Sequence, residues 1–381
     1  MPANEVDDLK TIPGLVRQRP RYRRRIVVCK TRETGVRVKR LSDPTRSRGG
    51  GRPTGGVTTA AALSLNVFKR DCVGARLASQ TSHLHQIAPY TSPPMSRQIW
   101  FVTGASNGLG LAVTEYMLDQ GLIVVAAVRR PDSMKAHQQK YGAENLLVVK
   151  VDVKSQEDVS AAFQEAEKKF GRIDVVYNNA GYSAVGEVEA MPMADAKDMF
   201  ETNFFGATRV SLAAIKFFRE VNKPIGGRLI QASSIYGVVP GGATGYYSAT
   251  KYALEGITES LSAELDPKWN IKITLAEMGF FRTNLIKNHT YEVYTHPAYK
   301  SPQLVGNVIR AMLVGADPSV IKGDPDKLAP RLYELARLAD PPLRVLLGLE
   351  GPPMLKARLE RDAAEREKYA SWAEGLNFDK E

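Results

Sequence analysis

From residue 99 onward, short and almost purely apolar segments alternate with longer amphipathic ones, and no other feature of the sequence constrains the fold as strongly. The run Leu122–Val128 contains no polar side chain at all. Strands of this kind are typical of parallel sheets covered on both faces, because an exposed face would carry a polar residue at every second position. The alternation therefore predicts an α/β fold, in which a doubly wound parallel sheet forms a single domain.

The predicted elements follow one another with short connections. We expect strands at Ile99–Thr103, Leu122–Val128, Leu146–Val151, Ile173–Tyr177, Arg228–Ala232 and Ile271–Leu275. Helices are predicted at Gly108–Gln120, Ser133–Tyr141, Ser155–Phe170, Ala194–Glu220 and Tyr246–Leu265. Ligands of such sheets bind beyond the carboxyl ends of the strands, where the winding reverses. Functional residues are therefore expected at strand ends and on the helices that follow.

Residues 1–94 differ in composition from the rest, with 18 basic side chains against 6 acidic ones and a glycine-rich stretch at residues 49–56. They account for the formal net charge of +11, so the remaining residues are close to neutral. Pro, Gly, Ser and Thr interrupt every short apolar patch, which leaves too little apolar surface to offset the entropy of ordering. We predict a disordered basic N-terminal segment over residues 1–94.

Three interpretations of this segment stay open. A transit peptide would make the protein mitochondrial, but Glu5, Asp7 and Asp8 near the start count against it. A nucleic-acid-binding tail would need more aromatic side chains for stacking than the segment has. In the third interpretation the segment is dispensable and a compact protein begins at Met95. We expect a cytoplasmic location and no nucleic-acid partner.

Other classes of protein are excluded by what the sequence lacks. No apolar run approaches the roughly 18 residues of a membrane-spanning helix. Cys29 and Cys72 are the only cysteines, and both precede the predicted domain. No Cys/His cluster has the spacing of metal ligands, so no metal site is expected.

The segment Thr103–Gly110 joins the first predicted strand to the first predicted helix. Gly104 permits a tight turn, Gly108 lets backbone approach a pyrophosphate, and Gly110 allows close packing of helix on strand. The free N–H groups at the helix N-terminus favour phosphate. A purely structural turn is the alternative. The residues predicted to bind a dinucleotide here are Thr103, Gly104, Ser106, Asn107, Gly108, Leu109 and Gly110.

The end of the second strand bears on the choice of cofactor. An NAD site usually has an acidic residue there for the ribose 2′-hydroxyl, whereas this chain has Arg129 and Arg130. An arginine at this place can bind the 2′-phosphate of NADP, so NADPH is preferred and NAD is the alternative. Further cofactor contacts are predicted at the next two strand ends, from Asp152, Val153, Asn179, Ala180 and Gly181.

Tyr247 and Lys251 lie four residues apart on a predicted helix, so they share one face. An ammonium beside a phenol favours the phenolate, so we expect Lys251 to lower the pKa of Tyr247 and make it an acid/base. Ser234 follows the fifth strand, where its hydroxyl can donate to a developing oxyanion. Asn203 lies within a predicted helix and can hold a water beside Lys251. A Ser-His-Asp triad is disfavoured because no Gly-x-Ser-x-Gly elbow occurs.

These motifs, in this order, resemble the short-chain dehydrogenase/reductase family over residues 96–283: Thr103–Gly110 matches its TGxxxGxG turn and Asn178–Gly181 its NNAG. The resemblance implies a Rossmann-like fold, NAD(P) binding and hydride transfer between nicotinamide and a carbonyl or alcohol. It implies that Tyr247 is the acid/base, that Lys251 also binds the nicotinamide ribose, that Ser234 positions substrate and that Asn203 maintains a proton relay.

The chain departs from the family after the sixth strand, where Met278 replaces the proline of the usual Pro-Gly. Loss of proline frees a φ angle, so we expect a looser loop there. Gly279 and Thr283 remain as predicted cofactor contacts.

We divide the chain into residues 1–94, a dinucleotide-binding catalytic core at 95–285 and a lid with a C-terminal extension at 286–381. An aromatic stretch predicts either a lid over an apolar substrate or a packed surface loop. The extension is expected to contain helix Leu328–Ala339, edge strand Val345–Leu349 and helix Lys356–Ala373. The residues of the aromatic stretch are Tyr291, Tyr294, His296, Pro297 and Tyr299.

The sequence thus favours an NADPH-dependent carbonyl reductase or alcohol dehydrogenase for a small, hydrophobic carbonyl or alcohol substrate. A non-catalytic dinucleotide-binding sensor on the same fold is the alternative. Family resemblance also implies a homodimer or homotetramer, paired through the helices that carry Asn203 and Tyr247.

Overall fold

The computed structural model describes residues 97–283, 292–315 and 318–378. The predictions of disorder, transit or nucleic-acid binding for residues 1–94 lie outside the described residues, as does Tyr291. Among the described residues no helix is both long and apolar enough to cross a membrane. The division at residues 94 and 285 stays a prediction.

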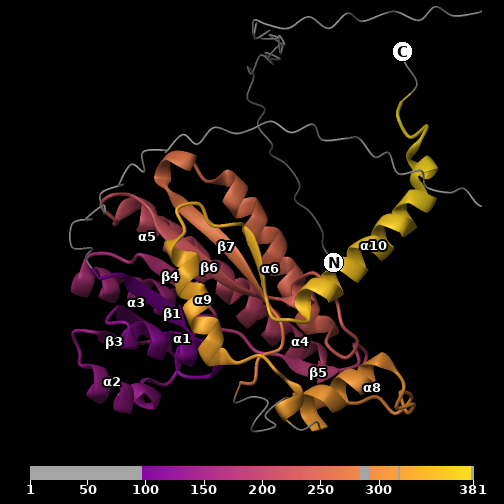
Figure 1. Cartoon of the computed structure of the whole chain (residues 1–381), viewed down its shortest axis with the longest axis horizontal. Helices are drawn as coiled ribbons and strands as arrows, with labels where there is room; N and C mark the ends of the chain where they lie inside the picture. The colour runs from indigo at the N-terminus through magenta and orange to yellow at the C-terminus, as the bar shows by residue number, and fades with distance from the viewer. Residues whose placement is uncertain (1–96, 284–291, 316–317, 379–381) are drawn as a thin grey trace, which may run out of the picture. The chain divides into compact units, whose positions relative to one another are not determined.

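Seven parallel strands form the main sheet in the order β3-β2-β1-β4-β6-β7-β9, so the predicted doubly wound α/β fold is confirmed (Figure 1). The winding reverses between β1 and β4. Val102 of β1 pairs with Ala126 of β2 on one side and with Tyr177 of β4 on the other. The strands are β1 (Ile99–Thr103), β2 (Ile123–Val128), β3 (Leu146–Lys150), β4 (Val175–Asn178), β6 (Gly227–Ser234), β7 (Ile271–Met278) and β9 (Arg344–Leu347).

Helices cover both faces of the sheet because successive residues of each buried strand point to opposite sides. Trp100 and Val102 pack with α1 (Gly108–Asp119) and α9 (Pro325–Arg337) on one face. Phe101 packs on the other face, stacked on Phe163 at 4.4 Å between ring centroids. The helices of that second face include α3 (Gln156–Phe170) and α5 (Ala207–Glu220).

The ends of α3 show how local sequence sets a helix. Ser155 caps the N-terminus by accepting a hydrogen bond from the N–H of Asp158 at 3.0 Å, and Gly171 ends the helix in the left-handed conformation. The serine hydroxyl satisfies a free N–H of the first turn, and glycine tolerates the positive φ of the last residue.

The predicted helix at Ala194–Glu220 is continuous but not uniform. It consists of α4 (Met193–Phe200), a six-residue π-helix at Glu201–Gly206 and α5. Single π turns within α-helices are frequent at functional sites, and this one contains Asn203. The catalytic helix predicted at Tyr246–Leu265 is α6 (Gly245–Glu264).

The C-terminal extension adds to the same sheet. The predicted edge strand is β9, which pairs with β7 along Leu275–Met278. The helix predicted at Leu328–Ala339 is α9, and the last one is α10 (Gly351–Lys368), which begins five residues earlier than expected because Pro352 and Pro353 fit a first turn. Three elements were not predicted from the sequence. Two of them, β5 (Ala184–Gly186) and β8 (Glu292–Tyr294), form a two-stranded sheet, and the third is helix α8 (Val305–Arg310).

Candidate active site

The turn between β1 and α1 has the conformation that its glycines permit. Gly104 and Gly108 have φ angles of +65° and +55°, which side chains other than glycine rarely adopt. Asn107 caps α1, its side chain accepting from the N–H of Gly108 at 2.9 Å. A methyl group at Gly110 would overlap the carbonyl oxygen of Gly104 and lie 2.6 Å from the side-chain nitrogen of Asn179. The turn therefore keeps its shape only with glycine at these places.

This turn is fastened to the end of β4 across the point where the winding reverses. The hydroxyl of Thr103 accepts hydrogen bonds from the N–H groups of Asn179 and Ala180 at 2.8 and 2.9 Å. The side chain of Asn179 donates to the carbonyl of Thr103 at 3.0 Å. Two predicted cofactor-binding segments thus form one rigid corner at the carboxyl edge of the sheet. Ser106 and Leu109 lie half-buried on its turn.

The four predicted catalytic residues come from three elements and meet beside this corner. Tyr247 and Lys251 lie on α6, and the side chain of Tyr247 interacts with Ser234 at the end of β6. The ammonium of Lys251 lies 5.8 Å from the centroid of the Tyr247 ring. A methyl group at Gly181 would lie 3.0 Å from the side-chain oxygen of Asn203 and 3.8 Å from the Lys251 nitrogen. All four side chains therefore border one site.

Asn203 is held firmly in the π-helix. Its side-chain oxygen accepts from the N–H of Tyr182 at 2.9 Å, and its amide donates to the carbonyl of Tyr182 at 2.8 Å. The amide also lies 3.2 Å from the hydroxyl of Thr250 on α6. Asn203 thus joins the π-helix to the loop after β4 and to the helix that carries Tyr247.

The electrostatics of the site differ from the expectation in one respect. The expected net lowering of the pKa of Tyr247 is not found: burial raises this pKa, and the interaction with Ser234 only opposes the rise. The ammonium of Lys251 donates to the carbonyl of Ala232 at 2.7 Å. Burial lowers the pKa of Lys251 to about 8, and Glu255 opposes that shift.

The loop after β7 is anchored, so the expectation of a looser loop is also wrong. The N–H of Gly279 donates to the carbonyl of Leu347 at 2.8 Å, and the N–H of Phe280 donates to the carboxylate of Glu350. Contacts from the C-terminal extension thus replace the rigidity of the missing proline. The side chain of Thr283 lies beside Gly108, 3.4 Å from where a methyl group there would stand.

An open cleft of about 450 Å³ lies at this junction between the phosphate turn and the C-terminal part. Its lining includes Gly108 and Thr283, which belong to the predicted cofactor site. Arg282 and Lys322 add positive charge, and the carbonyl of Ile321 accepts from Arg282 at 2.9 Å. The lining also includes Lys327 and the acidic residues Glu115, Asp324 and Asp326, so its three basic side chains are matched by three acidic ones.

The predicted adenosine end lies apart from the catalytic residues. Arg129 is exposed after β2, and its charge acts on both Lys154 and Asp198. The side chain of Asp152 caps the N–H of Lys154 at 3.0 Å, and Val153 is buried against Gly206. Two cations therefore stand close to the ends of β2 and β3.

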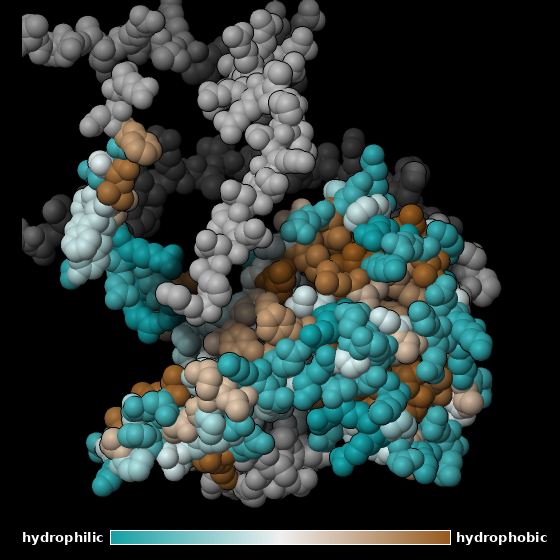
Figure 2. Space-filling model, turned by 180° about the vertical axis from the view of Figure 1, so that it is seen from behind, coloured by the Kyte–Doolittle hydropathy of each residue, from teal (hydrophilic) through white to brown (hydrophobic). Residues whose placement is uncertain are grey.

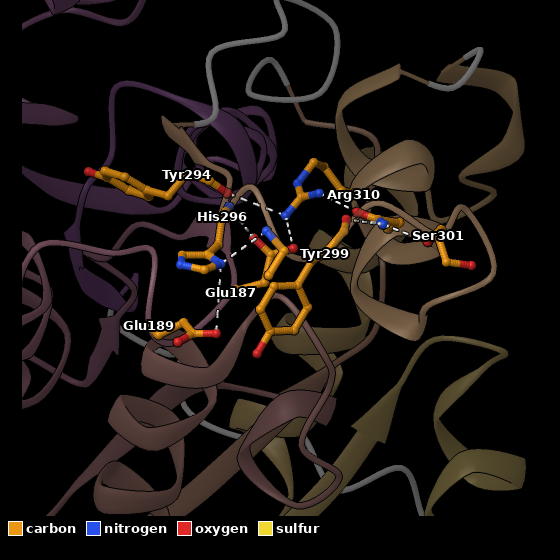
Figure 3. Close-up of polar contacts among 9 residues, drawn as sticks. Glu187, Glu189, Tyr294, His296, Tyr299, Ser301 and Arg310 are labelled. Atoms are coloured by element: carbon orange, nitrogen blue, oxygen red, sulfur yellow. Dashed lines mark hydrogen bonds and ion pairs between the residues drawn. The ribbon is translucent and has the colours of Figure 1, made fainter.

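The predicted lid is fixed to the core by a buried ion pair (Figure 3). Arg310 at the end of α8 pairs with Glu187, which follows β5 and is almost fully buried. Glu187 also accepts from the N–H of His296 at 3.1 Å, and Arg310 reaches the carbonyl of Tyr294 at 3.3 Å. Tyr299 is 40% exposed, and Pro297 is exposed as well. Glu187 thus ties the residues after β8 to α8, and His296 also lies 3.9 Å from the carboxylate of Glu189.

Sequence reasoning missed several residues that border the site. Tyr236 lies edge-on to Tyr247 at 6.3 Å between centroids and to Phe280 at 5.6 Å. Glu255 lies four residues after Lys251, a spacing that signals a shared helix face, whereas no local signal marks Arg344 as its partner.

Known oxidoreductases are similar to this chain in sequence. A family model described as short chain dehydrogenase matches residues 98–293. An uncharacterized oxidoreductase of Schizosaccharomyces pombe is 34% identical over 67% of this chain and 83% of its own length. The oxidoreductase calM of Penicillium decumbens is 33% identical over 68% of this chain and 87% of its own length.

Solved structures show the same likeness. A short-chain dehydrogenase from Streptomyces avermitilis is 31% identical, with a TM-score of 0.65, covering 74% of this chain and 100% of that one. Two more distant structures share the fold alone. One, from Burkholderia phymatum, is in complex with NAD (19% identical, TM-score 0.57, 75% and 98% covered). The other, an alcohol dehydrogenase from Thermococcus sibiricus, is complexed with 5-hydroxy-NADP. It is 21% identical, with a TM-score of 0.53, and the match covers 67% of this chain and 98% of that one.

Proposed function

Because this chain belongs to the short-chain dehydrogenase family and is an oxidoreductase, we propose that it transfers hydride between NADP(H) and a carbonyl or alcohol of a small hydrophobic substrate. The observation that carries the proposal is the meeting of Tyr247, Ser234 and Lys251, in which the side chain of Tyr247 interacts with Ser234 and the Lys251 ammonium lies 5.8 Å from the centroid of the same ring. These three side chains stand at the end of β6, next to the corner that suits a dinucleotide.

The residues of the corner fit the cofactor. The turn Gly104–Gly110 and the N-terminus of α1 would hold the pyrophosphate, Asp152 and Val153 the adenine end, and Asn179–Gly181 with Gly279 and Thr283 the nicotinamide end. The first turn of α1 contains no acidic residue that would repel phosphate. When bound, the nicotinamide supplies or accepts the hydride at the substrate carbon.

The side chains of the site supply the proton. In reduction, Tyr247 gives its phenolic proton to the carbonyl oxygen while the carbon receives hydride, and Ser234 donates a hydrogen bond to that oxygen. Lys251 stabilises the resulting phenolate with its positive charge and contacts the nicotinamide ribose. Asn203 holds the path by which solvent returns the proton. The reverse sequence oxidises an alcohol.

A substrate screen tests the proposal. Purified protein is incubated with hydrophobic ketones, aldehydes and alcohols and with either nicotinamide, while absorbance reports cofactor turnover. We expect turnover of apolar carbonyls with NADPH. Tight dinucleotide binding without turnover of any substrate would instead indicate the non-catalytic sensor. The cytoplasmic location stays a prediction that this screen does not address.

Arg129 is proposed to select NADPH through the 2′-phosphate. A charge-assisted hydrogen bond contributes roughly 1.5–3 kcal/mol, so Arg129→Gln should raise the KM for NADPH about tenfold or more and leave that for NADH unchanged. Arg130→Gln, a change at the neighbouring exposed arginine, is the control. Initial rates with both nicotinamides measure the effect. A wild-type preference for NADH would contradict the assignment.

The hydrophobic character of the substrate is proposed from the rings around Tyr247. Tyr236 and Phe280 pack in series beside it, and Tyr182, Tyr246 and Tyr294 border an apolar cluster with Met191 and Met199. Aromatic surface of this kind favours an apolar substrate, because an apolar substrate that covers the rings removes a large apolar area from water. Residues 292–299 would cover such a substrate as a lid.

A homodimer paired through α5 and α6 is proposed as well. Phe205 and Leu212 are 48% and 54% exposed, and Ile257 on α6 is 39% exposed. Hydrophobic residues also interrupt the hydrophilic surface in the view from behind (Figure 2). We expect that the double change Leu212→Lys and Ile257→Lys halves the mass measured by light scattering. The interface would otherwise bury ammonium groups that have no opposite charge beside them. Val305→Lys on α8 is the control, and an unchanged mass of the double variant would contradict this pairing.

A further inference from the structure

One arginine of the C-terminal extension stands among three carboxylates behind the catalytic helix. The guanidinium of Arg344 on β9 bonds Glu255 at 3.1 Å and Glu259 at 2.7 Å, both on α6. It also lies 3.6 Å from Glu277 on β7. Glu255 and Glu277 are only 5% and 2% exposed, whereas Glu259 is exposed. Two buried acids thus share one cation.

The catalytic helix holds β6 through three successive side chains of one face. Tyr247 interacts with Ser234, Lys251 donates a hydrogen bond to the carbonyl of Ala232, and Glu255 accepts one from the hydroxyl of Ser233. Lys251 and Glu255 are also close to each other. A methyl group at Gly237 would lie 3.3 Å from the Cβ of Lys251 and 3.3 Å from the Cγ of Glu255. Glu255 is also the carboxylate whose charge acts on the Lys251 ammonium.

The two buried acids are not equivalent. Burial raises the pKa of Glu277 to about 7, and one of its oxygens has no hydrogen-bond partner among the described residues. Burial also raises the pKa of Glu255, but Ser233 and Arg344 both oppose the rise by bonding its carboxylate. Glu277 therefore holds a proton more readily than an ordinary glutamate, whereas Ser233 and Arg344 bond the carboxylate of Glu255 and favour its charged form.

We propose that Glu255 is a positioning residue that keeps Lys251 protonated during the reaction, and that Arg344 holds Glu255 in its charged form. The inference rests on the function proposed above, because it assigns a role only if Lys251 assists Tyr247. It gives the C-terminal extension a part in catalysis: β9 sets the charge behind the active site. Neither residue touches substrate or cofactor.

The charges around Lys251 determine in which direction its pKa changes when Glu255 is replaced. Burial disfavours its ammonium, and the Glu255 carboxylate favours it. Removing the charge of Glu255 therefore lowers the pKa of Lys251, so the ammonium is lost at a lower pH. The titratable and polar groups that face Lys251 and Glu255 are Tyr247 and Glu259 of α6, Ser233 and Ser234 of β6, Glu277 of β7, Arg344 of β9 and Asn203 of the π-helix.

The pH dependence of kcat in full-length protein tests this inference. Glu255→Gln keeps the size of the side chain, and we expect the alkaline limb of its profile to move down by about one pH unit. Glu259→Gln removes the exposed partner of the same guanidinium and should leave the limb in place. Arg344→Gln should move it in the same direction as Glu255→Gln, and Arg344→Lys should restore most of the wild-type profile.

Each outcome decides the matter. An active wild type with superimposable profiles for Glu255→Gln and Arg344→Gln would overturn the inference alone. An equal displacement in Glu259→Gln would overturn it too, since a general loss of structure would then explain the shift. A wild type without turnover of any carbonyl or alcohol would refute the proposed function instead. If Glu255→Gln does not fold, the difference between Arg344→Gln and Arg344→Lys carries the test.

Discussion

Tyr247→Phe should lower kcat by about 10²–10⁴-fold, the usual contribution of a positioned acid/base group. The change removes the hydroxyl that interacts with Ser234 and that gives its proton to the substrate oxygen in the proposed mechanism. The ring remains, so its edge-on packing against Tyr236 and the fold around it should persist. Steady-state rates with the best substrate of the screen measure the loss.

Cofactor affinity separates this loss of chemistry from a loss of structure. Fluorescence titration with NADPH should give a Kd for Tyr247→Phe close to that of the wild type, because the phosphate turn is untouched. Tyr252→Phe is the matched control, since Tyr252 lies on the same helix, is 38% exposed and is not part of the proposed site. Turnover by Tyr247→Phe within a few fold of the wild type would refute the mechanism.

Gly110→Ala should weaken dinucleotide binding about 100-fold, the second-largest effect that we expect. The added methyl group would overlap the carbonyl of Gly104 and the side chain of Asn179, so the turn must move away from β4. Two lost backbone bonds to phosphate, at roughly 1.5 kcal/mol each, correspond to such a change in Kd. The overpacking should also cost about 1–3 kcal/mol in the free energy of unfolding.

Gly256→Ala is the control for the change at Gly110, because it makes the same substitution in an open part of a helix. No atom lies within 4 Å of the added carbon there, and its φ is not positive. We expect unchanged cofactor affinity and a small gain in stability of about 0.5–1 kcal/mol, from the better helix propensity of alanine. Nucleotide titration and chemical denaturation measure both. Equal affinities for the two variants would contradict a tight turn at Gly110.

Local patterns in the sequence determined the fold class and the order of the main-sheet strands and their helices from β1 to β7. The apolar run at β2, the serine cap of α3 and the glycines after β1 act over a few residues, so they can be recognised without the rest of the chain. That Tyr247 and Lys251 lie close together was predictable for the same reason, since residues four apart on a helix share one face. Their catalytic roles stay predictions.

Only the tertiary structure decided which distant groups surround those residues. It directed Lys251 to the carbonyl of Ala232, tied the loop after β7 to Glu350, and placed Arg344 between Glu255 and Glu277. It also paired β5 with β8 across more than a hundred residues. The physical reason is that burial and charge depend on what packs against a side chain from far along the chain. No local pattern of residues in the sequence indicates those contacts.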